Sequence, residues 1–395
     1  MKWLRDMVSF FRIPGAPPLI AGMFCYGIGL GILAPMNAVY MRDGIGLSKA
    51  EIASVFSIAL LINMIVTLSV GVISDQIKRK KTLPLAACLS GMIGLAVYMS
   101  SDSYGLTLTG MILIVGPSGL IMGQLFAMAR NHFMNKAADF FEMAQIWLRS
   151  TLSIGFFAGL LIGANVYLIA DFRGILIGNF VGIACLFVLL LLYKEHGGTA
   201  AGGVSQGEPF SLLMLVALLL LSCGDALRGL YLPLVVVQLF GKPELMSYLW
   251  SVQAVFELLF MTLAGYWAAQ YGSMRIIRIA ALFAVVVYVV YTFSPSIAFF
   301  FAVQPLYSFY VSVLFGVAMG YVQRMFHTRI GFGSSLYVVL TQTASLVGYL
   351  LPFLVPGYSP SIFYIPAALV AAALTLMWIA ARRERARPER KTLSA

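Results

Sequence analysis

Long apolar runs separated by short polar segments make up the pattern of hydrophobic and polar positions along this chain. Within each run the apolar residues follow one another continuously instead of alternating with polar ones, which favours helices over strands. A helix needs about 20 apolar residues to cross the hydrocarbon core of a bilayer, and twelve runs reach roughly that length. They lie near 18–40, 50–74, 82–99, 105–128, 143–168, 174–193, 211–239, 246–270, 276–293, 297–322, 333–355 and 361–381.

The composition also indicates a membrane protein. Of the 395 residues, 61% are hydrophobic and 10% are charged. This leaves too little polar surface to cover a soluble globule of that size. Inside lipid, only helices and closed barrels satisfy every backbone hydrogen bond, and the alternation that a barrel needs is absent. We therefore expect an all-α polytopic membrane protein with twelve transmembrane helices.

The net charge of +11 follows from the placement of Lys and Arg in the loops. If successive loops alternate between the two sides of the membrane, most of the 26 basic residues fall on one side. The other side holds Arg42, Lys49, Arg173 and Lys242. Loops rich in Lys and Arg stay in the cytoplasm, so we expect both termini there and the chain in the inner (cytoplasmic) membrane. The charge indicates topology in a lipid bilayer and no nucleic-acid partner.

Cysteine and histidine positions show no metal-binding pattern. The four cysteines, Cys25, Cys88, Cys185 and Cys223, lie inside predicted spans without CxxC or Cys/His spacing. The three histidines fall at loop or linker positions without ligand spacing. A membrane enzyme would need a nucleophile with its base, or a metal centre, so we expect no enzyme, no metal and no cofactor.

The segment KEHGGTAAGGVSQGEPF at 194–210 is polar, small and rich in glycine, which is typical of a flexible linker. It leaves six predicted spans in residues 1–193 and six in residues 211–395, which end in the basic tail RRERARPERK. Weak matches recur between the halves at a nearly constant offset, among them His132 with His327. In this the chain resembles major facilitator transporters, which have two six-helix bundles and a solute site between them.

The stretch GVISDQIKRKKTL at 71–83 resembles the cytoplasmic loop motif of that superfamily. The residues that fit its spacing are Gly71, Asp75, Arg79, Lys80 and Leu83. Gln76 and Lys78 depart from it, where an arginine and a glycine are usual. A small residue lets two helices approach, and an acid at a helix end can bind basic groups in one conformation and release them in another. We expect Gly71, Asp75, Arg79 and Lys80 to act as a conformational latch, with simple anchoring of the topology as the alternative for the basic residues.

Four further stretches resemble the bacterial sugar efflux transporter family, a branch of the major facilitators. They are GQLFAMARN at 123–131, WLRSTLSIG at 147–155, VFELLFMTLAGYWAAQYG at 255–272 and RIGFGSS at 329–335. The resemblance implies export of sugars and glycosides against protons. It also implies that Arg149 and Glu257 correspond to an arginine and a glutamate that the family carries within its spans.

Asp225 and Arg228 stand inside the seventh apolar run and have no counterpart in that family pattern. Ionisable groups in a membrane span cost several kcal/mol unless they are paired or face water. Residues three apart on a helix share a face, so these two can touch. Two interpretations remain open: the pair binds solute, or it locks the seventh span to its neighbours.

The eighth apolar run carries Trp250, Gln253 and Glu257 at helical spacing. An aromatic face beside an amide and an acid suits a sugar, whose apolar ring face packs on indole while its hydroxyls bind the polar groups. Glu257 has no basic neighbour on its own helix, so burial can neutralise it, and we expect it to carry the coupled proton. The repeat offset places Asn63 at the equivalent position of the first half.

Two more polar residues are candidates for solute contact. Gln342, in the eleventh run, could add a hydrogen bond. Arg149, in the fifth, could bind an anionic group or pair with Glu257. Gly155, Gly159 and Gly163 follow Arg149 at spacings of four, which predicts close helix packing. We expect the partner of these glycines to be the eighth span.

The residues and the resemblance together lead to one main hypothesis. The chain is a proton-coupled exporter of small polar solutes such as sugars or glycosides, which works as a monomer by alternating access of its two halves. The alternative is an exporter of a siderophore, drug or other zwitterionic or carboxylate-bearing compound, because Asp225 and Arg228 offer both charges in one place.

Overall fold

The computed structural model describes residues 10–11, 13–74, 81–136, 141–194, 210–294, 296–326 and 330–386. Helices account for the regular structure throughout these ranges, and none of the described residues forms a strand. The all-α fold class expected from the continuous apolar runs is therefore confirmed. The predicted linker at 194–210 lies almost entirely outside the described residues, as do Asp75, Arg79 and Lys80. The division at 1–193 and 211–395, like the latch, stays a prediction.

The number of membrane spans is consistent with twelve. Within the described residues, ten helices are long and apolar enough to cross a membrane, and a bent pair, Pro17–Leu33 with Asn37–Gly44, makes an eleventh. One of the ten, Trp147–Leu192, has 46 residues, or about 70 Å at 1.5 Å per residue. That is more than twice the thickness of the hydrocarbon core, roughly 30 Å. Its Asp171 has non-helical angles (φ 54°, ψ −156°), so this element contains the fifth and sixth expected spans.

The structure divides into two compact units. The first comprises Met1–Gly203 with Leu230–Leu258, and the second Val204–Gly229 with Leu259–Ala395. The helices α9 and α10 therefore each contribute to both units. The first unit contains α2 (Pro17–Leu33), α3 (Asn37–Val39), η1 (Tyr40–Gly44), α4 (Lys49–Ser74), α5 (Thr82–Met99), α6 (Tyr104–Val115), α7 (Ser118–Lys136), α8 (Phe141–Leu192) and parts of α9 (Leu212–Phe240) and α10 (Glu244–Tyr271).

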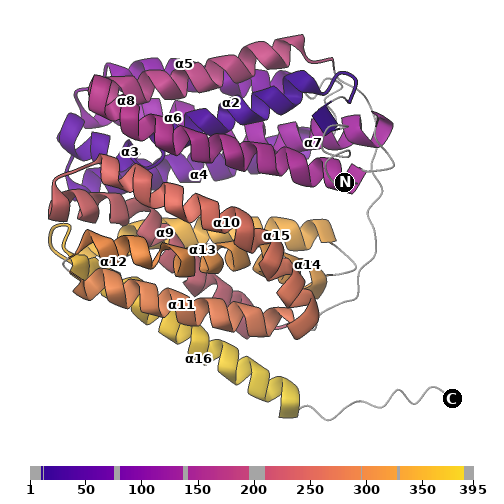
Figure 1. Cartoon of the computed structure of the whole chain (residues 1–395), viewed down its shortest axis with the longest axis vertical. Coiled ribbons are helices and arrows are strands. Elements are labelled where there is room, and N and C mark those ends of the chain that lie inside the picture. Colours follow the sequence, from indigo (N-terminus) through magenta and orange to yellow (C-terminus); the bar gives the residue numbers. More distant parts are fainter. Residues whose placement is uncertain are drawn as a thin grey trace. The chain divides into compact units, whose positions relative to one another are not determined.

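Helix α2 packs against α8, and in Figure 1 they lie side by side with α5. Glycine makes this close packing possible. A Cβ added at Gly159 would overlap the backbone of Ile28, and one added at Gly163 would lie 3.0 Å from the Cα of Ile32. On the later arm of α8, Gly182 would meet the Cα of Gly29 at 2.7 Å. The expectation of close packing is confirmed for the glycines, but the expected partner was wrong: they pack on the first span, not the eighth.

The break between α6 and α7 falls at Pro117, which has no backbone N–H to donate to the carbonyl four residues earlier. The hydroxyl of Ser90 donates to that carbonyl, Leu113, at 2.9 Å. Beside the break, the side-chain amide of Asn63 donates to the carbonyls of Val115 and Gly116 at 2.7 and 3.0 Å. Side chains of α4 and α5 thus help to satisfy the backbone acceptors at the break, together with the hydroxyl of Ser118, which donates to the carbonyl of Val115 at 2.8 Å.

The second unit packs around α11, which contacts α13 and α16. In Figure 1, α16 extends along α11 toward the C-terminal end of the chain. The tenth predicted span is not one regular helix, because the π-helix η3 follows α13. Besides the remaining parts of α9 and α10, the unit contains α11 (Ser273–Phe293), α12 (Ile297–Ala302), α13 (Gln304–Ser312), η3 (Val313–Ala318), α14 (Met319–Met325), α15 (Ile330–Leu350), η5 (Leu351–Leu354), η6 (Pro360–Phe363) and α16 (Tyr364–Ala386).

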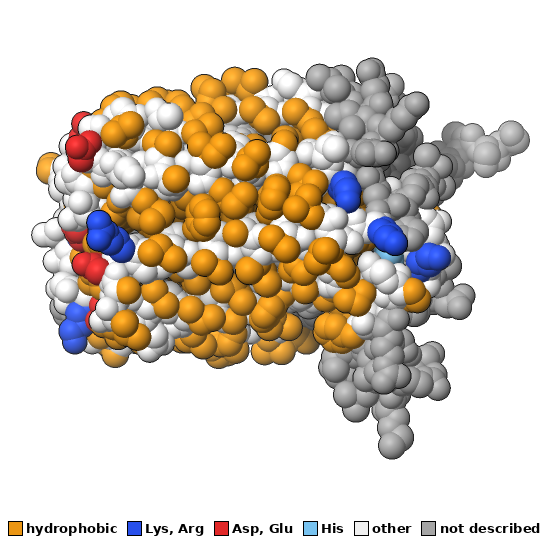
Figure 2. All heavy atoms as spheres, turned by 90° about the horizontal axis from the view of Figure 1, so that it is seen from above, with side chains coloured by type: hydrophobic (Ala, Val, Ile, Leu, Met, Phe, Trp, Pro, Cys, Tyr) orange, Lys and Arg blue, Asp and Glu red, His pale blue; other side chains and the backbone are white. Residues whose placement is uncertain are grey.

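Large apolar side chains lie on the outside of both units. Examples are Ile65, 53% exposed, in α4 and Leu282, 54% exposed, in α11. Figure 2 shows hydrophobic side chains across the middle of one face, with charged side chains gathered at its two ends. Water does not favour an apolar surface of this extent, whereas a bilayer covers it. The chain is a multi-pass membrane protein.

Candidate functional site

Arg228 is the more deeply buried of the two charged residues in the middle of α9. Its side chain is 2% exposed. One guanidinium nitrogen donates to the Oε1 of Gln304 at 3.0 Å and, at 3.5 Å, to the hydroxyl of Tyr291. The guanidinium carbon also lies 3.8 Å from the centre of the Tyr307 ring. A buried cation is stable only with such partners, so Arg228 is fixed to α11 and α13.

Gln304 is held on both sides of its amide. Its nitrogen donates to the hydroxyl of Tyr291 at 2.9 Å and to the carbonyl of Phe300 at 2.8 Å, while its oxygen accepts from Arg228. The ring of Tyr291 in turn stacks on Phe300 with centroids 4.9 Å apart. Because the amide uses its donors and its acceptor at once, it can adopt only one orientation without losing hydrogen bonds.

Asp225 is only half-buried, and one of its carboxylate oxygens accepts a hydrogen bond from the hydroxyl of Tyr307. The same tyrosine presents its ring to Arg228. Tyr307 therefore links the two charged residues: its polar end contacts the acid and its aromatic face contacts the base. The spacing of three predicted that Asp225 and Arg228 can touch; in this structure Tyr307 of α13 is the group that contacts both of them.

Sequence analysis did not single out the residues that hold this cluster. Gln304, Tyr307 and Tyr310 follow one another at intervals of three, so they lie along one side of the tenth span. Tyr288 and Tyr291 have the same spacing in the ninth. All five are buried, and the Tyr310 hydroxyl donates to the carbonyl of Leu221 in α9 at 2.7 Å. Polar side chains three apart in an apolar run were the signal that could have identified them.

The predicted stripe on α10 lies in the first unit. Trp250, Gln253 and Glu257 are all half-buried. The amide nitrogen of Gln253 is 3.5 Å from Oε2 of Glu257, a long hydrogen bond between neighbours one turn apart. The three side chains thus combine an indole, an amide and a carboxylate along one side of a helix, each of them reachable in part.

The other predicted site residues have different surroundings. Asn63 is 7% exposed, and its amide nitrogen is engaged at the α6–α7 break. Arg149, on α8, is exposed, and Gln342, on α15, is half-buried. Gly71 lies in the last turns of α4, while its companions in the predicted latch fall outside the described residues.

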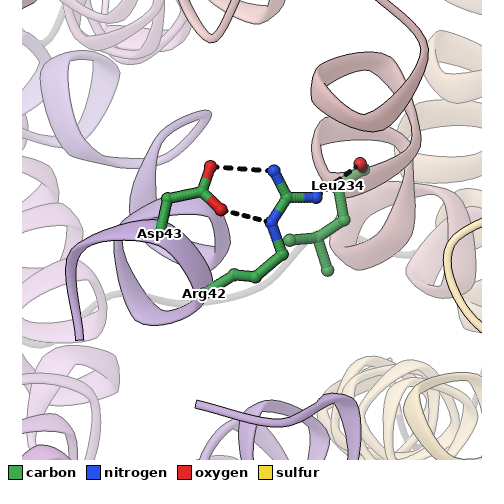
Figure 3. Close-up of polar contacts among 3 residues, drawn as sticks. All are labelled: Arg42, Asp43 and Leu234. Atoms are coloured by element: carbon green, nitrogen blue, oxygen red, sulfur yellow. Dashed lines mark hydrogen bonds and ion pairs between the residues drawn. The ribbon is translucent and has the colours of Figure 1, made fainter. Parts of the chain in front are cut away.

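A polar contact joins η1 to α9 within the first unit. Arg42 binds Asp43 through two hydrogen bonds, of 2.5 and 2.8 Å, and donates a third, of 3.0 Å, to the carbonyl of Leu234. Figure 3 shows the guanidinium between these two acceptors. Nearby, the Nζ of Lys49 lies 5.5 Å from the centre of the Tyr231 ring. Both basic residues belong to the small group expected on the non-cytoplasmic side, and both contact α9.

The sequence matches the model of the Major Facilitator Superfamily over residues 19–349. It is 22% identical over 369 residues to sugar efflux transporter A of Dickeya chrysanthemi, an alignment that covers 90% of this chain and 93% of that protein. It is 23% identical over 351 residues to sugar efflux transporter A of Escherichia coli (strain K12), with 85% and 88% covered. A putative sugar efflux transporter of Deinococcus radiodurans is 23% identical over 378 residues, with 92% and 96% covered.

Solved structures share the fold at low identity. The crystal structure of the nucleoside transporter NupG has a TM-score of 0.77 at 11% identity and covers 95% of this chain and 100% of its own. A bacterial homologue of the iron transporter ferroportin, in an inward-facing state, has a TM-score of 0.69 at 16% identity, with 92% and 98% covered. The match to the superfamily model spans most of the chain and agrees with the helical membrane fold. This protein is a transporter of small molecules rather than an enzyme, and it belongs to the Major Facilitator Superfamily.

Proposed function

We propose that this transporter exports sugars or glycosides in exchange for protons by alternating access. In this proposal the chain works as a monomer in the inner membrane with both termini in the cytoplasm. The observation that carries the proposal is the half-buried stripe of Trp250, Gln253 and Glu257 on α10. Indole offers a flat apolar surface to a sugar ring, and the amide and carboxylate offer hydrogen bonds to its hydroxyls.

The named relatives support the same solute class. Those described above are two sugar efflux transporters and one putative sugar efflux transporter, and they align with at least 85% of this chain. The α10 stripe adds a physical reason for the same solute class.

Glu257 is the proposed proton carrier. It is half-buried, and its contact with Gln253 is a neutral amide at 3.5 Å. Partial removal of a carboxyl group from water favours its neutral form, which a proton carrier must be able to adopt. Asp225 is the proposed polar contact for solute on α9, because it is half-buried and its contact with Tyr307 uses one of its two oxygens.

The contributions of the other site residues follow from their surroundings. Arg149 and Gln342 remain proposed solute contacts, since Arg149 is exposed and Gln342 is half-buried. For Asn63, the hydrogen bonds at the α6–α7 break favour a role in holding the helices over one in direct solute contact. For Arg228, burial to 2% exposure favours a role in organising the site.

The second candidate function, export of a zwitterionic or carboxylate-bearing compound, depends on Arg228 as a cationic contact. Its guanidinium is covered by Gln304, Tyr291 and Tyr307 in this conformation. A carboxylate would have to displace these partners and leave buried polar groups unsatisfied, at a cost of about 1–3 kcal/mol for each group. The geometry therefore favours a neutral hydroxylated solute.

Alternating access requires contacts that form in one conformation and break in another. The hydrogen bond from Arg42 to Leu234 is one candidate, because it joins segments 192 residues apart. Gly71, Asp75, Arg79 and Lys80 are the proposed counterpart at the cytoplasmic end.

The proposal is tested with purified protein in liposomes that enclose a pH-sensitive dye. A panel of sugars and glycosides, a siderophore and a cationic drug is offered under an imposed pH gradient. We expect the sugars or glycosides to move protons and the variant Glu257→Gln to abolish this coupling. Glu244→Gln, at the first turn of the same helix, is the matched control and should couple normally. Unchanged proton movement in Glu257→Gln would exclude the coupling role, and transport of the drug or siderophore alone would exclude the solute class.

A further inference from the structure

We propose that Tyr307 is a positioning residue for solute binding. Its hydroxyl orients the carboxylate of Asp225, its ring is braced against Arg228, and one oxygen of the acid is left for hydroxyl groups of the solute. The inference rests on the proposed function in one respect, because it takes Asp225 to be a solute contact. It adds Tyr307, a residue on a different span, and it gives Arg228 the role of holding the ring of Tyr307.

The first observation is the unequal burial of the two charges. Arg228 is 2% exposed and has contacts on α11 and α13, whereas Asp225, three residues earlier on the same helix, is half-buried. Asp225 accepts its hydrogen bond from Tyr307. The base is thus part of the packed interior, and the acid is the member that a solute can reach.

The second observation is the rigidity of the support. The ring of Tyr307 lies 3.8 Å from the guanidinium of Arg228, whose nitrogen is held by Gln304. Gln304 is itself fixed by the Tyr291 hydroxyl and the carbonyl of Phe300. The Tyr307 ring also packs edge-on against Tyr310 with centroids 5.7 Å apart. Each group is held by another that has little freedom, so the Tyr307 hydroxyl occupies a defined place.

A defined donor matters for a carboxylate, because the last torsion of an Asp side chain is broad and roughly two-fold. Without a fixed partner the group samples many orientations, and solute binding must restrict it. A hydrogen bond already formed in the unbound protein removes that cost in advance. It also leaves the second oxygen with its acceptor capacity, which suits the hydroxyl donors of a sugar.

The two functions of Tyr307 can be separated by one substitution. Tyr307→Phe removes the hydroxyl and keeps the ring over Arg228. We expect the KM for export to rise about tenfold, the effect of losing a hydrogen bond to a charged group, while kcat changes less than about twofold. Tyr98→Phe is the control, because Tyr98 is a buried tyrosine of α5 in the first unit whose hydroxyl donates to Oδ1 of Asn37 at 2.8 Å. It should leave KM unchanged.

Asp225→Glu provides a second, independent variant. It keeps the charge and moves the carboxylate by one methylene, away from the place where Tyr307 holds it. We expect a loss of affinity similar to that of Tyr307→Phe, and no further loss when the two are combined, since both remove the same contact. Wild-type KM in Asp225→Glu would overturn the positioning role even if Tyr307→Phe failed to fold.

The probe is whichever radiolabelled sugar of the panel the unaltered protein exports from liposomes. The variant Asp225→Asn tests the solute contact at Asp225 separately from the positioning role of Tyr307. If Asp225→Asn weakens export but Tyr307→Phe has a normal KM, the inference about Tyr307 is wrong and the proposed solute contact stands. If Asp225→Asn itself leaves KM unchanged, the solute role of Asp225 fails and the inference with it. If Tyr307→Phe lowers only thermal stability, the residue is structural.

Discussion

Arg42 donates a hydrogen bond of 3.0 Å to the backbone carbonyl of Leu234, which joins the end of the first predicted span to α9. The same guanidinium is oriented by two hydrogen bonds to Asp43. Paired donors to a carboxylate restrict the plane of an arginine side chain, so the remaining nitrogen is directed at the carbonyl. The adjacent residue Asp43 thus orients Arg42 for a contact with a segment 192 residues away.

This relationship predicts that Arg42→Gln destabilises the conformation in which the contact is formed. Spin labels on cysteines placed at the exposed residues 50 and 238 would report the distance between the two segments, in a background without the native cysteines. We expect the population at longer distance to rise about five- to tenfold, the effect of losing roughly 1 kcal/mol. Arg173→Gln, an exposed arginine expected on the same side, is the control. An unchanged distance distribution in Arg42→Gln would show that the contact does not hold this conformation.

Gln304→Leu should destabilise the second unit. The change removes one acceptor of a buried guanidinium and the donors to Tyr291 and Phe300, and each buried polar group left without its partner costs about 1–3 kcal/mol. Thermal unfolding in detergent should show a clear fall in the midpoint. Gln238→Leu, at an exposed position on α9, should change it little.

The double variant Arg228→Met with Gln304→Leu tests the reason for that fall. Removing both polar partners leaves no charge to desolvate, so the pair should be more stable than Gln304→Leu alone. If the double variant is instead the less stable, the loss in Gln304→Leu comes from packing and not from the charge.

Gly159→Ala should destabilise the first unit, because the added methyl group would overlap the backbone of Ile28. Overpacking of this kind typically costs about 1–3 kcal/mol, measured as a lower midpoint of thermal unfolding. At Gly123, on α7, an added Cβ meets nothing within 4 Å. Gly123→Ala should be neutral or slightly stabilising, since alanine favours a helix by up to about 1 kcal/mol over glycine. Equal midpoints for the two variants would contradict the close approach of α2 and α8.

Asn63→Leu separates the two roles considered for this residue. Its hydrogen bonds to Val115 and Gly116 predict a loss of about 1–3 kcal/mol in stability, with KM for export unchanged. A raised KM at normal stability would instead identify Asn63 as a solute contact. Pro117→Ala restores a backbone N–H toward the carbonyl of Leu113, which Ser90 already serves, so in the Asn63→Leu background we expect it not to recover the loss.

The helices were predictable because a membrane span can be recognised from a continuous run of apolar residues in the sequence. A run of about 20 apolar residues has few alternatives to a helix in lipid, and the confirmed fold class followed from that. The internal form of the spans did not follow. Pro117 could mark a break. The hydrogen bonds from Ser90 and Asn63 to the backbone carbonyls near it depend on how α4 and α5 pack, which the local sequence does not specify.

The candidate site was predictable in part for a similar reason. Asp225 and Arg228 are conspicuous because charge is rare in apolar runs, and their spacing predicted a shared helix face. Tyr307 and Gln304 are not conspicuous, since uncharged polar residues occur throughout the spans. The partner of Gly159 was mistaken, because glycine at helical spacing indicates a close approach without naming the helix that approaches.

Local chemistry along the chain therefore determined the class of protein, the helical spans and the presence of two charged residues inside one span, because hydrophobic length and the cost of desolvation act on each segment separately. Only the tertiary structure decided that Tyr307 links Asp225 to Arg228, that Gln304 holds the base, and that Arg42 binds the carbonyl of Leu234. Each of these contacts joins residues between 76 and 192 positions apart, and contacts at such separations depend on how whole helices pack, which no local pattern encodes.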